Sequence, residues 1–556
     1  MRPTKIAADT SFLMRLHHFC RVRNAPTPLP DDPAGSQPHR REAGPHQVPA
    51  APIPAETPTE TPKKCSSSPK FPGKHSTFPG PQSKGDQPKH TQRRSPHDLG
   101  TQPIGRLLWW TCSQTTASVG VYGIYALTNA WFVARGVGES ALAAVNLVAP
   151  LLLLLGAVST TVGVGGASIV SRALGAGHPG RAGRAAGNSF VVFWGTVVLV
   201  TVGGLVFLEP LLRLVGTTDA TMPFAKPYAA VIIGGAIFST GFSALVRAEG
   251  RLFFSTMLWG IPVLVQMVLD PILIFGLNLG VVGAGLGTVG GQAVSACMAV
   301  WFFFIQKNRP YRVGWAQLRP HFPTIRQVLS IGAPSFLAGL GATLLTLVIN
   351  TTLALAGAGV LAAYAVCARV QTFVTMPQTG ITQGVQPIVS FNAGARLFER
   401  VQRARTLALR ASFLYGALAA GVIAAGARPL VGLFLSSPEA VDQSAFALRI
   451  IALSFVFSGI GQLVSAYFQA LGMPAPSYLI SIGTLLVIKL PIVLAFGHWW
   501  GPTGIWWAIP AGEAASALAA MVLLGRKPLS SPPTSPALPT SLSLPTSPAP
   551  SANPTS

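Results

Sequence analysis

Long stretches without a charged side chain dominate this sequence. Residues 141–170, 271–306, 327–368, 370–395 and 450–488 contain no Lys, Arg, Asp or Glu. A helix needs about 20 mostly apolar residues to cross the hydrocarbon core of a bilayer, so each stretch is long enough for one or two spans. Charged residues make up only 10% of the chain, against about 25% in soluble domains. The pattern therefore predicts an all-α polytopic membrane protein.

Gly and Pro clusters divide the longest stretches, which allows the spans to be counted. We predict twelve transmembrane helices, at about residues 107–133, 141–170, 187–208, 224–246, 253–276, 281–305, 327–354, 360–392, 406–427, 445–470, 475–497 and 503–525. Residues 1–103, with 19 prolines, and residues 528–556, rich in Pro, Ser and Thr, are expected to be disordered. A start codon assigned too far upstream is a second interpretation of residues 1–103.

The loop charges predict the orientation of the chain. With the N-terminus inside, the inside segments carry 18 Lys or Arg residues and the outside loops carry five, namely Arg135, Arg213, Lys226, Arg428 and Arg449. Short loops rich in Lys and Arg stay in the cytoplasm. We therefore expect both termini to be cytoplasmic. The net charge of +23 is explained by these loops and by the basic N-terminal extension, so no nucleic-acid partner is expected.

Two halves of the sequence match at a nearly constant offset. Ile169-Val170-Ser171 recurs as Ile388-Val389-Ser390, and Arg181 recurs as Arg400, each 219 residues later. Six spans per repeat is an even number, so both halves begin on the same side of the membrane. We predict two six-helix bundles, residues 104–306 and 327–527, joined by a cytoplasmic loop at 307–326. A pseudo-twofold axis along the membrane normal relates them, and rocking about a central cleft gives alternating access.

Several ordered motifs resemble those of the MATE (multidrug and toxic compound extrusion) family, in particular its bacterial multidrug-exporter branch. They include residues 103–108, 131–138, 168–177, 269–271 and 386–395. The resemblance implies a secondary active antiporter of the bacterial inner membrane, without a cofactor. It implies export of small amphipathic or cationic drugs and toxic metabolites in exchange for protons or sodium. We expect a monomer surrounded by membrane lipids.

Asp270 is the strongest candidate for coupling export to an ion. It lies in the middle of a predicted span, where an ionisable group is costly and usually functional. Desolvation favours its neutral form, and a carboxylate that holds either a proton or a cationic drug makes the two compete. The structural alternative is a helix cap, with Pro271 at the first position of a restarted helix.

Further charged and amide side chains inside the spans extend the candidate list. Asn129 stands where the family resemblance implies an Asp for proton coupling, and it either binds substrate or makes an interhelical hydrogen bond. Glu513 either binds a cation or pairs with one of two expected buried basic partners, Arg369 and Lys489. Expected cavity-lining amides, for which helix–helix hydrogen bonding is the alternative, are Gln292, Asn350, Gln378, Gln383 and Gln386.

Three other classes of protein are alternatives to a transporter of drugs. A membrane enzyme is disfavoured because His178, His321 and His498, the three histidines beyond the N-terminal extension, lie far apart, without a catalytic motif or a metal-binding pattern. A flippase of lipid-linked precursors is the main alternative, although such cargo requires a cavity rich in basic side chains. A scaffold or sensor without transport activity is the third.

Overall fold

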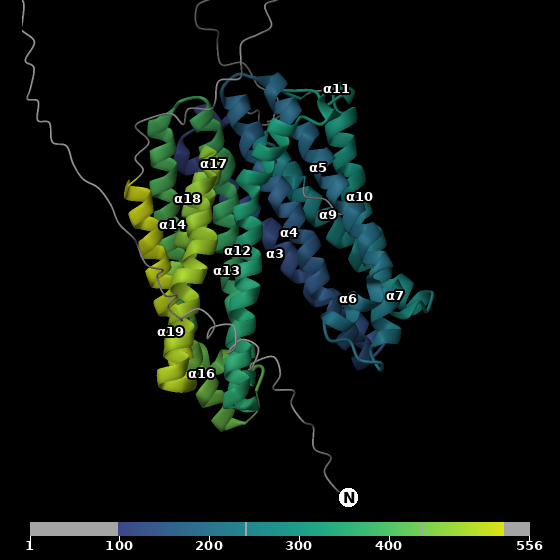
Figure 1. Cartoon of the computed structure of the whole chain (residues 1–556), viewed down its shortest axis with the longest axis vertical. Coiled ribbons are helices and arrows are strands. Elements are labelled where there is room, and N and C mark those ends of the chain that lie inside the picture. The colour runs from purple at the N-terminus through teal and green to yellow at the C-terminus, as the bar shows by residue number, and fades with distance from the viewer. Residues whose placement is uncertain (1–97, 239–241, 308, 436, 527–556) are drawn as a thin grey trace, which may run out of the picture. The chain divides into compact units, whose positions relative to one another are not determined.

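The computed structural model describes residues 98–238, 242–307, 309–435 and 437–526. The expected disorder of residues 1–97 and 528–556 lies outside these ranges. The described chain consists of helices joined by short turns and loops (Figure 1). This confirms the expected fold class, and the helices follow the predicted spans closely.

The N-terminal bundle is built from the first half of the repeat. Its two longest helices are α3 (Ile104–Gly136) and α4 (Glu139–Gly175). The other elements are α5 (Pro179–Val206), α6 (Leu208–Leu214), α7 (Met222–Gly234), η1 (Gly235–Phe238), α8 (Ser243–Ala248), α9 (Leu252–Pro271), η2 (Ile272–Gly276), α10 (Gly280–Val300) and η3 (Trp301–Ile305). The short helix α11 (Trp315–Leu318) follows in the connecting loop.

The C-terminal bundle repeats this order. It begins with α12 (Phe322–Ala356) and α13 (Ala358–Gly394), the counterparts of α3 and α4. The remaining elements are α14 (Phe398–Ala425), α15 (Ala427–Gly432), α16 (Pro438–Ala452), α17 (Phe455–Leu471), α18 (Pro474–Tyr478), η4 (Leu479–Gly483), η5 (Leu485–Lys489) and α19 (Leu490–Arg526).

The count of spans depends on two breaks within long helices. Eight helical segments are long and apolar enough to cross a membrane, and the pair α16 and α17, bent by 42°, makes a ninth. The segment 474–526 holds two expected spans, separated at Gly501, whose φ of 58° and ψ of −141° are not helical. With α3 and α4, of 33 and 37 residues, the twelve predicted spans are accounted for.

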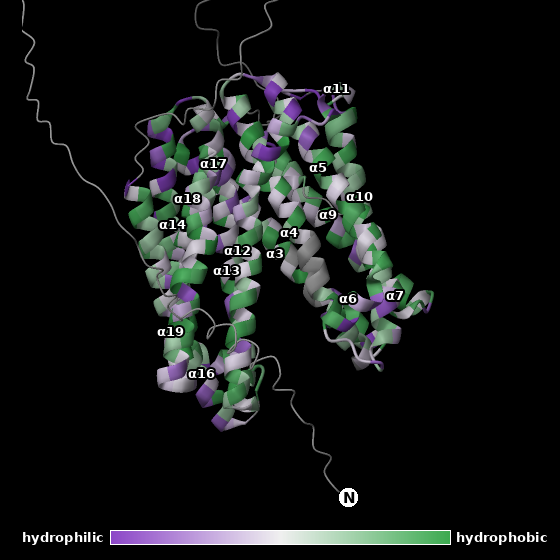
Figure 2. Ribbon diagram, viewed as in Figure 1, coloured by the Kyte–Doolittle hydropathy of each residue, from purple (hydrophilic) through white to green (hydrophobic). Residues whose placement is uncertain are grey.

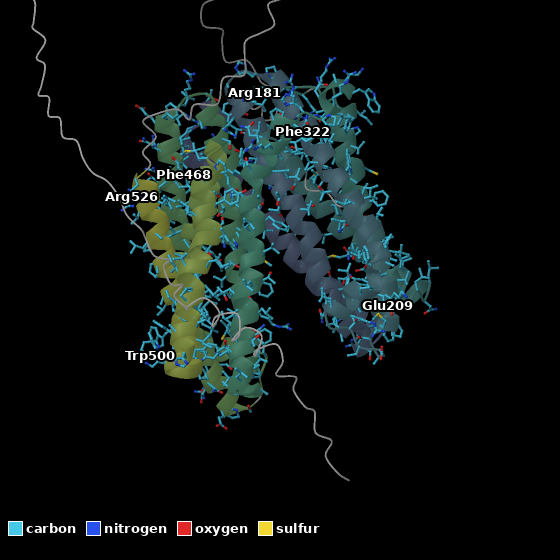
Figure 3. All side chains as sticks on the ribbon, in the orientation of Figure 1. Arg181, Glu209, Phe322, Phe468, Trp500 and Arg526 are labelled. Carbon is cyan, nitrogen blue, oxygen red and sulfur yellow. The ribbon has the colours of Figure 1, made fainter. Side chains whose placement is uncertain are left out.

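The outer surfaces of the helices are apolar, as a lipid environment requires. Exposed large side chains follow one face of several helices, for example Leu199 and Val202 on α5 and Leu414 and Leu418 on α14. Hydrophobic residues cover much of the helical surface, and hydrophilic ones gather toward the ends (Figure 2). The loops alternate between two ends. Arg181 lies at one end, with Phe322, while Glu209 and Trp500 lie toward the other (Figure 3). We call the end that carries Arg181 and Phe322 the arginine-rich end.

The two bundles meet through reciprocal contacts, as twofold symmetry demands. Gly175 of α4 packs on the carbonyl oxygen of Phe391, and Gly394 of α13 packs on the carbonyl oxygen of Arg172. Gly175 and Gly394 are 219 residues apart, as are Arg172 and Phe391. The matching loops therefore lie at the same end of the molecule, which agrees with a parallel duplication.

Hydrogen bonds between the bundles end on main-chain carbonyl groups. Thr115 Oγ1 donates to Gly380 O at 2.5 Å, and Ser168 Oγ donates to Gln469 O at 2.6 Å. Ser171 Oγ donates to Pro387 O at 3.0 Å. Arg172 also reaches across, with a 3.3 Å bond to Leu471 O at the carboxyl end of α17, where a cation is favoured. In each of these bonds the acceptor is a main-chain oxygen, so the bond does not depend on the side chain of the accepting residue.

The contact between the bundles does not extend along the whole of α12 and α13. Toward the middle of these long helices, Gly332 packs on Thr161, and Met376 packs on Gly123. Gly339 lies seven residues after Gly332 on α12, and Arg369 lies seven residues before Met376 on α13, so each is further from the arginine-rich end on nearly the same helix face. Both Gly339 and Arg369 are exposed. The bundles therefore pack together toward the arginine-rich end and separate toward the other, where α6 and α16 lie apart (Figure 1).

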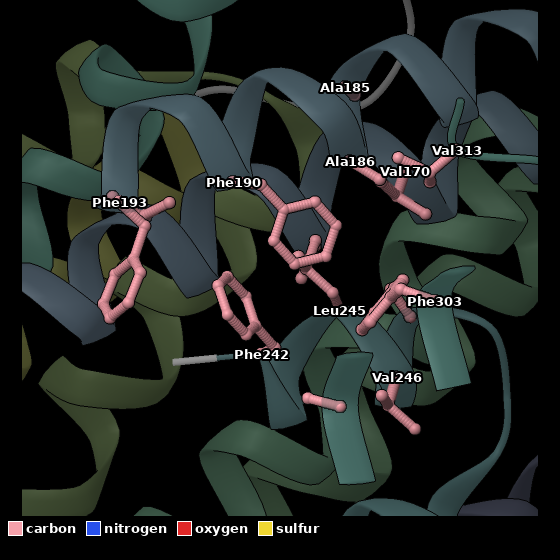
Figure 4. Packing of buried hydrophobic residues seen from close by; sticks show 14 of the residues in the cluster. Val170, Ala185, Ala186, Phe190, Phe193, Phe242, Leu245, Val246, Phe303 and Val313 are labelled. Atoms are coloured by element: carbon pink, nitrogen blue, oxygen red, sulfur yellow. The ribbon is translucent and has the colours of Figure 1, made fainter. Parts of the chain in front are cut away.

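An aromatic core supports the N-terminal bundle at the arginine-rich end. Phe190, Phe242 and Phe303 pack edge to face, with ring centroids 4.4 and 4.8 Å from Phe190 (Figure 4). Beside it, Arg309 and Glu249 form an ion pair whose side chains are 1% and 0% exposed. This rigid core holds α8, which carries Arg247, against the other bundle.

The expected disordered extension ends earlier than predicted. Residues 98–103 were assigned to it, but Asp98–Thr101 forms helix α2 and Leu99 is 1% exposed. Asn392 Nδ2 donates to the carbonyl oxygen of Leu99 at 2.9 Å, and Arg400 donates to that of Gln102 at 2.7 Å. Burial of Leu99 and these bonds to two main-chain carbonyls explain why this segment is ordered.

Candidate functional site

Asp270 lies inside the N-terminal bundle, on α9, and is 1% exposed. Its Oδ2 atom accepts hydrogen bonds from Asn129 Nδ2 of α3 and from Gln266 Nε2 of α9, each at 3.4 Å. The Gln266 amide also donates to Thr288 Oγ1 of α10 at 3.0 Å. Four polar side chains from three helices therefore form one buried network around the carboxylate.

The second carboxylate oxygen of Asp270 is unused. Oδ1 is buried and has no hydrogen-bond partner, and Gly287 of α10 packs directly against it. Among the described residues, no basic side chain forms an ion pair with Asp270. A buried carboxylate without a cation is costly. Oδ1 is therefore free to carry a proton, and the absence of a side chain at position 287 is what allows α10 to pack against it.

The helix does not break at Asp270, so the helix-cap interpretation is wrong. Pro271 has helical φ and ψ angles of −64° and −36°. The chain continues directly into η2 (Ile272–Gly276), a π-helical segment with wider turns. Asp270 is thus an ionisable residue within a continuous span.

The expected acid of the C-terminal bundle has a basic partner. Lys489 Nζ of η5 lies 2.6 Å from Glu513 Oε1 of α19. The side chains are 21% and 18% exposed. This pair is the structural alternative considered for Glu513, and it leaves the carboxylate neutralised by a neighbour on the adjacent span.

Arg369 is exposed, in contrast to the expectation that it is a buried basic partner. It lies on α13, seven residues before Met376 and therefore about two helical turns further from the arginine-rich end than the contact of Met376 with Gly123. No acidic side chain within the described ranges pairs with it. The reason is geometric, because Arg369 occupies the face of α13 toward the N-terminal bundle at the level where the bundles have separated.

The five expected cavity amides occupy different environments. Gln378 is 1% exposed, donates to Phe455 O at 2.8 Å and accepts from Ser458 Oγ at 2.8 Å. It joins α13 to α17 inside the C-terminal bundle and does not line a cavity, which corrects that prediction. Gln383 and Gln386 lie at the contact between the bundles, while Asn350 and Gln292 are partly exposed. Asn129, which was also expected in the cavity, is 7% exposed and faces Asp270.

Sequence reasoning missed two members of the Asp270 network. Gln266 is four residues before Asp270, so the pair shares one helix face, and this spacing alone was sufficient to find it. Thr288 belongs to another helix, and its place beside Gln266 depends on the packing of α9 on α10. Arg247, read only as a loop charge, is buried at 8% exposure. Within the described ranges, no three His, Cys, Asp or Glu side chains gather as metal ligands would.

Comparison with known families gives a match in each half of the chain. A family model described as MatE matches residues 117–272 and 334–494. "Multidrug export protein MepA" of Staphylococcus aureus (strain MSSA476) is 28% identical over 414 residues, covering 72% of this chain and 89% of the relative. The protein of the same name from Staphylococcus haemolyticus (strain JCSC1435) is 26% identical over 406 residues, with the same coverage.

A solved structure shares this fold. It is described as "Outward-facing conformation of a multidrug resistance MATE family transporter of the MOP superfamily". Its TM-score is 0.73 at 23% identity, covering 79% of this chain and 100% of that one. The likeness concerns the arrangement of the helices.

Proposed function

Because the chain belongs to the MatE family, we propose that it is a secondary active efflux transporter of the cell membrane. It exports small amphipathic or cationic organic compounds, drugs and toxic metabolites among them, in exchange for protons or sodium. The names of the relatives from Staphylococcus support multidrug export. The observation that carries the coupling is Asp270, a buried carboxylate with one free oxygen and with no basic partner among the residues that the structure describes.

Coupling follows from competition for one negative charge. With a proton or sodium ion on Asp270, the buried network is neutral and stable. Without it, the carboxylate requires another cation, and a cationic cargo meets that need. Asn129 donates a hydrogen bond but does not titrate, so a single carboxylate of the N-terminal bundle carries the exchange. Glu513, neutralised by Lys489, is assigned a structural role in this scheme.

Movement follows from the twofold arrangement. The bundles, residues 104–306 and 327–527, rock about their contact and expose the space between them to either side of the membrane in turn. The described conformation is closed at the arginine-rich end. With 18 of 23 loop charges there, that end is assigned to the cytoplasm, both termini with it. This conformation then releases cargo outward from a bacterial inner membrane.

A one-for-one exchange of a proton for a monovalent cationic cargo moves no net charge, so the concentration gradient of the coupling ion drives it. For an uncharged cargo, the electrical gradient alone is sufficient for useful export. One charge moving through 100 mV releases about 2.3 kcal/mol. At about 1.4 kcal/mol per factor of ten, this sustains a cargo gradient of roughly fortyfold. No nucleotide is required, and the function proposed is transport without an enzymatic step.

Export of lipid-linked precursors, the alternative, requires several basic side chains around an anionic head group. On the faces of α12 and α13 that turn toward the other bundle beyond their contact, Arg369 is the single cation among the described residues. One arginine does not make a site for a pyrophosphate, so drug export remains the proposal.

The test uses the full-length protein in proteoliposomes with a fluorescent organic cation. Under an imposed proton gradient, the wild type and Asp219→Asn are expected to transport equally, since Asp219 is an exposed loop acid. Asp270→Asn is expected to lose energised transport and to bind the cationic probe more weakly, while it still inserts into the membrane. Equal transport by Asp270→Asn refutes the assignment, and a sodium gradient applied alone distinguishes the two coupling ions.

A further inference from the structure

A small cavity lies between the two bundles near the arginine-rich end. The N-terminal bundle contributes Arg247 of α8, and the C-terminal bundle contributes Gln383, Gln386 and Ser390 of α13. The space open to the centre of a water-sized particle is about 10 Å³. That is room for one water molecule or one monoatomic ion.

Arg247 brings an uncompensated charge to this cavity. The residue is 8% exposed, and its one described hydrogen bond is from Nη1 to Ser255 Oγ at 3.3 Å. None of the ion pairs in the described chain includes it, since Glu249 pairs with Arg309. An arginine stays protonated in a protein. An unpaired buried cation costs several kcal/mol, so this arrangement calls for a negative partner.

The sequence repeat shows that packing alone does not require the charge. The counterpart of Arg247 is Gln469, and that of Ser255 is Ser477, each 222 residues later. Gln469 Nε2 donates to Ser477 Oγ at 2.9 Å, and its Oε1 accepts from Ser335 Oγ at 3.0 Å. A neutral amide therefore satisfies the same position in the C-terminal bundle. The arginine adds a charge with no use inside its own bundle.

The other lining groups include further donors. Gln383 makes no described hydrogen bond, so its amide group is available to an occupant. Gln386 Nε2 has only a long bond of 3.4 Å, to Val164 O. The hydroxyl group of Ser390 already donates its proton to Ala470 O at 3.1 Å, so Ser390 lines the cavity without offering a hydrogen-bond donor to an occupant. A guanidinium and two amide groups around a space of this size suit an anion and repel a cation.

We propose that this cavity binds one small inorganic anion, chloride in the cell, and that the anion ties the two bundles together. The site draws its ligands from both bundles, so it exists only while they pack as described here. Chloride then stabilises this conformation over the one in which the arginine-rich end is open. In the open conformation water replaces the anion around Arg247. The role is independent of cargo and of the coupling ion.

Double spin labelling tests this linkage without any transport measurement. The full-length protein, lacking its five cysteines, receives labels at Ala220→Cys and Ser437→Cys, exposed positions of different bundles. Chloride is exchanged for gluconate at constant ionic strength. At ten times its dissociation constant, chloride is expected to raise the ratio of this conformation to the other about elevenfold. Arg184→Gln, which removes an exposed charge at the same end, is expected to keep this response.

Arg247→Gln is the decisive variant, and it reproduces the residue that the other bundle carries. It is expected to fold with a melting temperature at low chloride that is not below that of the wild type, because it removes the unpaired charge, and to lose the chloride response. A wild type without the response, or a variant that keeps it, overturns the proposal. Bromide-soaked crystals of the wild type give a measurement that needs no variant. An anomalous peak beside Arg247 is expected, and a cavity that holds only water overturns the proposal.

Discussion

Gly332 provides a direct test of the contact between the bundles. This residue of α12 packs on the carbonyl oxygen of Thr161 in α4, and a Cβ atom at position 332 would overlap that oxygen. The oxygen belongs to a helix backbone, so it moves only if α4 moves. Gly332→Ala is therefore expected to push the bundles apart at the arginine-rich end.

The magnitude follows from the cost of overpacking, which is about 1–3 kcal/mol for a methyl group in a tight site. At about 1.4 kcal/mol per factor of ten, the ratio of this conformation to the other falls about 5- to 150-fold. The label pair at positions 220 and 437 measures the ratio. The overlap is absent when the arginine-rich end is open, so the variant changes the balance of conformations more than the stability of the fold.

Two further glycine variants separate this effect from general damage. Gly459→Ala overlaps Ser412 and Gln378 inside the C-terminal bundle, so it is expected to lower the melting temperature without changing the ratio. Gly421→Ala meets open space on the surface of α14 and is expected to leave both unchanged. If Gly332→Ala lowers the melting temperature as Gly459→Ala does and leaves the label distances alone, the interpretation of the contact is refuted.

Three shorter predictions concern the buried polar groups. Lys489→Met leaves Glu513 unpaired and is expected to lower the free energy of unfolding by about 1–3 kcal/mol. The double variant Lys489→Met/Glu513→Met is expected to recover most of this stability. Thermal unfolding in detergent measures both variants, and a double variant as unstable as the single one would contradict the pairing. Gln378→Leu is expected to lower the melting temperature, with transport per folded molecule unchanged, because its amide bonds stay inside one bundle. Asn129→Asp places a second carboxylate beside Asp270, so the two carboxylates are expected to share a proton and to shift the pH profile of transport. An unchanged pH profile would show that position 129 does not act on Asp270 during transport.

The fold was predictable because its determinants are repeated and local. Uncharged stretches long enough to span a bilayer, alternating loop charges and the 219-residue offset each follow from the chain itself. The reciprocal packing of Gly175 and Gly394 then follows from the symmetry that the offset implies. The helix at residues 98–101 was not predicted, because the carbonyl oxygen of Leu99 gains its hydrogen-bond donor, Asn392, only when α13 packs beside it.

The site was predictable in part. Asp270 stood out because a charge within a span has few explanations, and Gln266 was within reach through its helical spacing. Gln378 and Gln386 are two turns apart on α13, yet one bonds within its bundle and the other reaches across to Val164. Lys489 and Arg369 differ likewise, since the position of α19 decides which of them meets Glu513. Which helix each face meets is set by tertiary packing, and a single sequence does not record it.

The carbonyl acceptors at the bundle contact have an evolutionary consequence. Thr115, Ser168 and Ser171 each bond to the main chain of the opposite bundle, and a main chain offers the same oxygen whatever side chain it carries. After a gene duplication, mutations on the accepting side could therefore accumulate without breaking the joint. The two halves were free to specialise while their contact was kept: the N-terminal half carries Asp270 without a basic partner among the described residues, and the candidate acid of the C-terminal half, Glu513, is paired with Lys489.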